Sequence, residues 1–189
     1  MFLLSAGKKG EKAVPVDTKA MIADAFIKLT HQKSLDKITI KDIVEHCSIS
    51  RQAFYYHFQD ILDVIEWIVR RNMQKAFEES LLIDDPRETM LYMVRHMTEN
   101  HDKIHRLLSS QHGEQIEDII MQTFCSLLKE VRLRKYPRAA LPTADPDTTL
   151  RFLAYGSAGV IKEAVKSGRC DPEFLCDELY ALTTKAFDS

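Results

Sequence analysis

The segment RQAFYYH, which begins at Arg51, places long hydrogen-bond donors and aromatic rings within about two helical turns. Arg51 and Gln52 are of the types that pair with base edges through two hydrogen bonds, whereas the hydroxyl of Tyr and the ring N–H of His suit phosphate oxygens. Tyr55, Tyr56 and His57 cannot all point inward from so short a helix. The segment therefore predicts a surface that binds duplex DNA.

A short helix and a tight turn precede this segment and would position it. Apolar residues at 40, 43, 44 and 47 recur with the spacing of one helix face. Thr39 is placed to cap that helix, with Asp42 three residues later as its capping-box partner. The following residues, Ser48-Ile49-Ser50, are typical of a turn and a new cap. The two helices thus have the spacing of a helix-turn-helix.

Two helices this short cannot each bury enough apolar surface by themselves, so a third element must cover them. The apolar stripe that follows Asp17 predicts an amphipathic helix, and Phe26 and Leu29 are its expected contacts. Phe54 and Phe58 carry no polar atom and are expected to complete this small core. One face of the segment that begins at Arg51 is then left free for DNA.

The stretch from Thr39 to Phe58, TIKDIVEHCSISRQAFYYHF, resembles the N-terminal signature of the TetR family of bacterial transcriptional regulators. The resemblance is close over about residues 18–68 and implies an all-helical, dimeric, cytoplasmic protein that binds double-stranded DNA. It departs from the family pattern at Ser48, where a turn glycine is usual, and at Ile61, where many members have a phosphate-binding lysine. The DNA contacts that the resemblance implies are Thr39, Lys41, Arg51, Gln52, Tyr55, Tyr56 and His57.

The rest of the chain is also expected to be helical. Three Asp-Pro pairs, at 85–86, 145–146 and 171–172, each place a carboxylate at a helix N-cap and proline at the first helical position. We expect an all-α fold of about nine helices, the later ones over about 60–82, 86–100, 102–109, 114–134, 146–167 and 172–187. The expected organisation is an arm over 1–16, a DNA-binding domain over 17–59 and a domain for effector binding and dimerisation over 60–189.

The body is rich in Met, Tyr, His and Phe on helical stripes, which is also what an ordinary core contains. The resemblance implies an effector cavity, and an apolar or amphipathic small molecule would suit these side chains. No single charged residue stands out as an anchor. The candidate pocket residues are Met90, Tyr92, Met93, His96, Met97, Phe124, Phe152 and Tyr155.

The stretch from Phe152 to Gly168 resembles the dimer-forming region of the family. Its small residues at 156–159 allow two helices to pack closely, so we expect the last two helices to form a two-fold, four-helix interface in a homodimer. The candidate interface residues are Gly156, Val160, Ile161, Ala164, Phe174, Leu175, Leu179 and Leu182.

Other classes of function find less support in the sequence. Hydrophobic residues make up 45% and charged residues 29%, and four scattered cysteines form no CxxC pair, so a cytosolic protein without structural zinc, cofactor or membrane span is expected. Nucleophile-elbow, phosphate-loop and zinc-protease motifs are lacking, which argues against an enzyme. His101 and His105 share a helix face, but no Cys or carboxylate lies at a spacing that completes a metal site.

We therefore expect a dimer that places two recognition helices in successive major grooves of a pseudo-palindromic operator. The helix over about 60–82 is expected to be the only element that touches both head and body, so an effector would act through it. Two alternatives keep the fold: a body that binds a protein partner, or one that binds a metal ion. An enclosed cavity in the bundle would favour the small effector over the protein.

Overall fold

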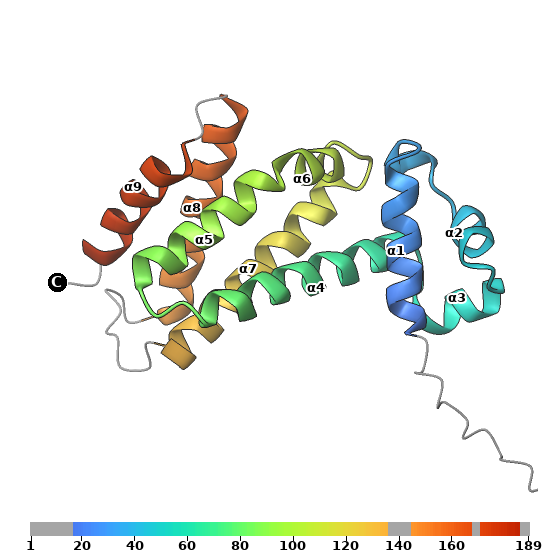
Figure 1. Cartoon of the computed structure of the whole chain (residues 1–189), viewed down its shortest axis with the longest axis horizontal. Coiled ribbons are helices and arrows are strands. Elements are labelled where there is room, and N and C mark those ends of the chain that lie inside the picture. Colours follow the sequence, from blue (N-terminus) through green and yellow to red (C-terminus); the bar gives the residue numbers. More distant parts are fainter. Residues whose placement is uncertain (1–16, 136–144, 168–170, 186–189) are drawn as a thin grey trace, which may run out of the picture.

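The computed structural model describes residues 17–135, 145–167 and 171–185. Within these ranges the chain forms nine α-helices and one short 3-10 turn, which confirms the all-α expectation (Figure 1). The predicted arm over 1–16 and the loop that begins at Tyr136 lie outside the described residues. The elements are α1 (Thr18–Thr30), η1 (Leu35–Lys37), α2 (Ile40–Cys47), α3 (Arg51–His57), α4 (Ile61–Leu81), α5 (Pro86–Glu99), α6 (His101–Leu108), α7 (Gly113–Lys135), α8 (Pro146–Lys166) and α9 (Pro172–Lys185).

Most helices begin where the cap residues predict. Asp17 accepts a hydrogen bond from the backbone of Ala20 and caps α1. Asp85 and Asp145 cap α5 and α8, each with proline at the first helical position. The backbone amide of Glu173 donates to Asp171 at 3.0 Å at the start of α9. Each carboxylate satisfies amides that have no partner within the helix, which fixes where the helix starts.

Helices α1, α2 and α3 pack with the first half of α4 around one apolar core at one end of the molecule (Figure 1). Phe54 and Phe58 are fully buried in it, as expected, together with Phe26 of α1. Leu29 of α1 closes the same core. Fully burying a side chain of this size stabilises the fold by about 1.5–3 kcal/mol, so the core is sufficient to hold α3 against α1 and α4.

Helix α7 also reaches this head, which corrects the expectation that α4 is the only connection. Ile116, in the first turn of α7, is fully buried in the head core. The backbone amide of Gln111 donates to the carboxylate of Asp36 in η1 at 3.1 Å. Gly113 makes the tight α6–α7 turn possible, since a Cβ at this position would lie 2.0 Å from the carbonyl oxygen of Leu108. The head therefore contacts the body through both α4 and the α6–α7 turn.

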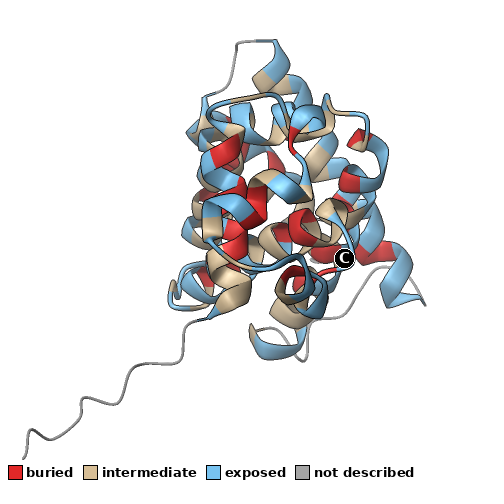
Figure 2. Cartoon of the chain, turned by 90° about the vertical axis from the view of Figure 1, so that its right-hand side faces the viewer, coloured by how far each residue is buried: buried red, intermediate tan, exposed pale blue. Residues whose placement is uncertain are grey.

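A second apolar core joins α5, α8 and α9 in the body, at the end away from the head. Its buried members include Leu91 and Val94 of α5, Ile161 of α8 and Leu179 of α9. Figure 2 shows buried residues where helices face one another and exposed residues on the outer faces. Among the described residues, no helix is long and apolar enough to span a bilayer.

Candidate DNA-binding surface and effector cavity

The turn between α2 and α3 is tightly fixed. Ser48 adopts the left-handed conformation, with φ of 55° and ψ of 41°, at the position where the family usually has glycine. The amide of Ile49 donates to the carbonyl of Val44 at 3.0 Å. Ser50 then caps α3 by accepting a hydrogen bond from the amide of Ala53, also at 3.0 Å. A side chain in the left-handed region is strained, so the turn tolerates a small cost in order to set the angle of α3.

One face of α3 is open to solvent, as a DNA-reading surface requires. Arg51 and Gln52 are exposed, and Tyr55 and Tyr56 keep 55% and 85% of their surface exposed. Arg51 makes no ion pair with any described residue, so its guanidinium is free to hydrogen-bond with a base. His57 is half-buried, and its ring lies edge-on to that of Tyr56 with centroids 5.0 Å apart. The ring of Tyr55 likewise lies edge-on to the buried ring of Phe54, with centroids 5.6 Å apart.

The N-terminus of α2 lies at the other edge of the predicted DNA surface. Thr39 and Asp42 form the predicted capping box: the amide of Asp42 donates to the Thr39 hydroxyl, and the Thr39 amide donates to the carboxylate at 2.7 Å. The Thr39 hydroxyl also donates to that carboxylate, at 2.6 Å, so it has no further proton to donate to a phosphate. Hydrogen bonds from Lys33 and Thr39 hold the pKa of Asp42 well below its usual range. Lys41 is exposed and has only a loose pair with Glu45.

Ile61, at the start of α4, is half-buried and packs against the head core. It supports the head by apolar contact and supplies no charge to a phosphate. The departure from the family pattern at this position therefore exchanges one electrostatic contact for packing.

The body contains a cavity of about 410 Å³ between α4, α5, α7, α8 and α9. Four of the eight predicted pocket residues line it: Met90, Met93 and Met97, which lie on one face of α5, and Phe124 of α7. The other four, Tyr92, His96, Phe152 and Tyr155, do not line the cavity, so their assignment to the pocket is corrected. The wall also includes Phe77 and Ser80 of α4.

Tyr92 and His96 lie on α5 but outside the cavity wall. The hydroxyl of Tyr92 donates to Glu79 of α4, and burial together with this hydrogen bond raises the pKa of Tyr92 to about 12. The ring of His96 stacks on that of Tyr92, with centroids 6.3 Å apart. Phe152 and Tyr155 of α8 face solvent, at 76% and 56% exposure. The rotation of side chains around α5 separates Tyr92 and His96 from the methionines, whereas Phe152 and Tyr155 lie on the outer face of α8.

Arg132 of α7 lines the cavity, although no local pattern of residues sets it apart from its neighbours. It is the only charged residue in the described wall. In the sequence it is one of three cations in the last turn of α7, beside Arg134 and Lys135, where basic residues are common because they complement the helix dipole. Only the packing of α7 identifies which of the three faces inward.

The predicted dimer residues divide into two groups. Ile161, Leu175 and Leu179 are buried inside the subunit, and Ala164 packs against them, so their assignment to a surface is corrected. Exposed apolar or small side chains also lie on α8 and α9, and two of them, Phe152 and Tyr155, are residues that were predicted to line the pocket. This α8–α9 stripe consists of Phe152, Tyr155, Gly156, Val160, Phe174 and Leu182.

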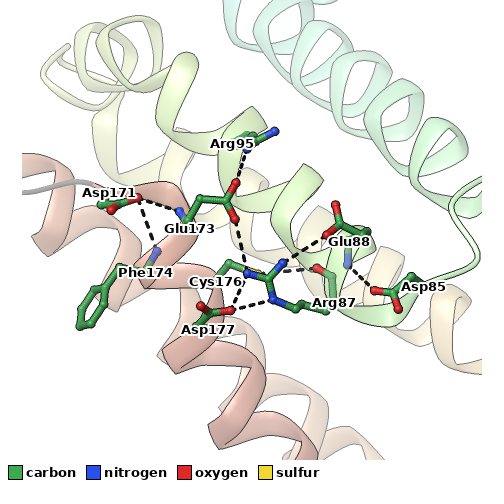
Figure 3. Close-up of polar contacts among 9 residues, drawn as sticks. All are labelled: Asp85, Arg87, Glu88, Arg95, Asp171, Glu173, Phe174, Cys176 and Asp177. Atoms are coloured by element: carbon green, nitrogen blue, oxygen red, sulfur yellow. Dashed lines mark hydrogen bonds and ion pairs between the residues drawn. The ribbon is translucent and has the colours of Figure 1, made fainter.

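A group of ion pairs fixes α9 against α5 and so sets the direction of this stripe (Figure 3). Arg87 Nε donates to Asp177 Oδ1 at 2.7 Å, and its Nη2 lies 3.3 Å from Glu173 Oε2. Arg95 also pairs with Glu173. The hydrogen bond to Asp177 raises the pKa of Arg87. Figure 3 shows the ring of Phe174 pointing away from these arginines, toward the outer face.

His101 and His105 share a face of α6, with ring centroids 5.7 Å apart. In the part of the chain that the structure describes, no group of three or more His, Cys, Asp or Glu side chains gathers as metal ligands would. The described residues thus give no support to the metal alternative.

Comparison with known proteins agrees with the architecture. Residues 22–66 match the model of bacterial regulatory proteins of the tetR family, and residues 84–185 match that of a transcriptional regulator C-terminal region. The HTH-type dhaKLM operon transcriptional activator DhaS of Lactococcus lactis subsp. lactis (strain IL1403) is 26% identical over 83 residues. That alignment spans 44% of this chain and 44% of the relative, so the chain matches less than half of that protein's length.

Solved structures share the fold. The dihydroxyacetone kinase operon activator DhaS superposes with a TM-score of 0.65 at 19% identity, covering 92% of this chain and 97% of that one. The fatty acid degradation regulator FadR from Bacillus halodurans gives 0.52 at 14% identity, covering 86% and 96%. The two family matches, together with the helix-turn-helix and its exposed recognition helix, identify the chain as a member of the TetR family of DNA-binding transcriptional regulators, which are not enzymes.

Proposed function

We propose that this regulator acts in the cytoplasm as a homodimer on a pseudo-palindromic operator, and that a small molecule in the body cavity changes its affinity for DNA. The observation that carries the proposal is the open polar face of α3, held by the left-handed turn at Ser48 and the cap at Ser50. In this proposal residues 17–59 form the DNA-binding domain, and residues 60–189 bind the effector and the second subunit.

In the complex, Arg51 and Gln52 contact base edges in the major groove. Tyr55 and His57 contact phosphates, and Tyr56 contacts a base or the backbone. At the start of α2, Lys41 exchanges its loose pair with Glu45 for phosphate contacts, which is inexpensive because both side chains are exposed. Thr39 acts chiefly by holding the end of α2 in place, because a hydrogen bond from its hydroxyl to phosphate would replace the one to Asp42.

The α8–α9 stripe supports the dimer. Large apolar side chains exposed together on one surface are typical of an interaction site. Gly156 and Gly159 are exposed within α8, and a Cβ at either position would meet nothing within 4 Å. Glycine inside a helix costs about 1 kcal/mol relative to alanine, and close approach of a second helix would explain its presence. Two copies of α8 and α9 would then form a four-helix interface.

The route from effector to DNA follows from the two connections between body and head. Phe77 and Ser80 of α4 line the cavity, while Val64 and Ile65 of the same helix lie in the head core. Phe124 of α7 lines the cavity and Ile116 enters the head core. A ligand that prefers one arrangement of α4 and α7 therefore shifts the population of head positions. The volume and the apolar lining of the cavity support this small-molecule mechanism, and a protein partner bound to the body is the alternative.

Selection of bound sites from random duplexes tests the proposal. Because a two-fold dimer presents α3 twice, the selected sites should contain two inverted half-sites whose centres lie about 34–36 Å apart along the duplex. A single, asymmetric half-site, or no enrichment over the starting pool, would contradict it.

A further inference from the structure

We propose that the effector is an amphiphile with one carboxylate, whose apolar body lies among the methionines of the cavity and whose carboxylate pairs with Arg132. This assignment rests on the proposed role of the cavity as the effector site and adds the chemical class of the ligand. The apolar lining of the cavity and the unpaired guanidinium of Arg132 support it.

Most of the described cavity wall is apolar, and its polar side chains are the hydroxyls of Ser80, Thr89, Ser157, Tyr180 and Thr183 together with Arg132. Its lining comes largely from Met, Leu, Val, Ile and Phe side chains. Three of its hydroxyl groups are already committed to backbone carbonyls: Ser80 donates to Phe77 at 2.7 Å, Thr183 donates to Leu179 at 2.8 Å, and Thr89 donates to Asp85 at 2.9 Å. A volume of about 410 Å³ holds one small molecule of ordinary size. A neutral sugar or other highly hydroxylated ligand would lose its hydrogen bonds to water in such a site.

Arg132 is the only charged residue in the described wall. Its Nε is buried and makes no hydrogen bond, and the guanidinium forms no ion pair with any described residue. The two other cations in the same turn are engaged: Arg134 pairs with Glu130 and Glu78, and Lys135 donates to the carbonyls of Ser80 and Ile83. Arg132 as a whole is half-buried, but the N–H at its buried Nε has no partner, and a buried donor without a partner is costly. A carboxylate accepts two parallel hydrogen bonds from a guanidinium, and such a pair would remove this cost.

The charge of the described cavity wall sets how many anionic groups the ligand carries. Arg132 is the only charged residue in the described wall, and Lys135 lies just beyond Ser80 and Thr89, where it strengthens the positive potential at that end. The Lys135 ammonium is held by the carbonyls of Ser80 and Ile83, so Arg132 is the one cation of the described wall with which a ligand can pair, and one guanidinium balances one carboxylate. The carboxylate would then be held by α7, and Phe77 and Ser80 of α4 line the same cavity. These are the two helices that continue into the head.

Calorimetric titration of the full chain, without DNA, tests the assignment with matched pairs of probes: decanoate against decan-1-ol, and 2-naphthoate against 2-naphthol. Each pair shares one apolar body and differs in the carboxylate, and the two bodies distinguish a linear from a ring-shaped ligand. We expect the acid of at least one pair to bind at least 10-fold more tightly than its alcohol. Arg132→Met should abolish that preference and leave the affinity for the alcohol unchanged.

Arg134→Met is the matched control, since it removes an equivalent charge that already has partners. It should leave both affinities unchanged. Arg132→Gln replaces the Met variant if that one fails to fold, and Arg132→Lys should restore part of the preference for the acid. Equal binding of acid and alcohol, a preference that survives removal of Arg132, or the absence of binding by all four probes would overturn the assignment. Because no DNA is present, these outcomes are independent of whether the chain binds an operator.

Discussion

Replacing both Arg51 and Tyr55 with alanine is expected to lower the affinity for the selected operator about 100-fold. A bidentate contact from Arg to a base contributes roughly 1–3 kcal/mol, and every 1.4 kcal/mol is a factor of about ten, so loss of this contact and of a phosphate contact accounts for the effect. Both side chains are exposed and lie outside the head core, so the fold should be unchanged. Fluorescence anisotropy with labelled operator measures the affinity.

A control pair separates this effect from a general loss of charge. Lys28→Ala with His31→Ala also removes one cation and one ring from exposed positions, but at the C-terminal end of α1, away from α3 (Figure 1). This variant should bind the operator within a few-fold of the unmodified chain. Operator affinity that is unchanged in the Arg51 and Tyr55 variant would remove α3 from the DNA interface.

Replacing Phe152 and Leu182 with glutamate is expected to convert the dimer to a monomer and to reduce operator affinity about 1,000-fold, toward the non-specific level. In the proposed interface both side chains meet the second subunit, and an unpaired carboxylate buried there is strongly unfavourable. In the isolated subunit they face solvent, so the variant should still fold. Sedimentation at about 10 µM, together with operator binding, measures both effects.

Leu82→Glu provides the control for this experiment. Leu82 is 84% exposed and apolar, but it follows the end of α4 and lies outside the α8–α9 stripe. The Leu82 variant should remain dimeric with full operator affinity. A dimer that persists after both substitutions at Phe152 and Leu182 would place the subunit contact elsewhere.

Local chemistry made much of the fold predictable. Asp17, Thr39 with Asp42, and the Asp-Pro pairs fix helix starts because their partners lie within three residues along the chain. The open face of α3 could be predicted for a similar reason: a helix of seven residues has room to bury Phe54 but not the neighbouring tyrosines as well.

The sequence could not show which of several apolar faces meets which neighbour. Val160 and Ile161 are adjacent and similar, yet the first faces outward and the second lies in the body core. Met93 lines the cavity, whereas the adjacent Tyr92 does not. Neighbouring side chains on a helix point about 100° apart, and only the packing decides which direction is inward. The contact between Asp36 and Gln111 joins residues far apart in sequence, and no local pattern marks it.

The central claim is that two copies of α3 are held at a fixed separation that matches successive major grooves. Inserting 5 base pairs at the centre of the selected operator turns one half-site by about half a helical turn, to the opposite side of the duplex. We expect operator affinity to fall about 1,000-fold, to the level of unrelated DNA, because only one head can then engage its half-site. Affinity unaffected by the insertion would show that the heads bind independently, and would contradict the claim.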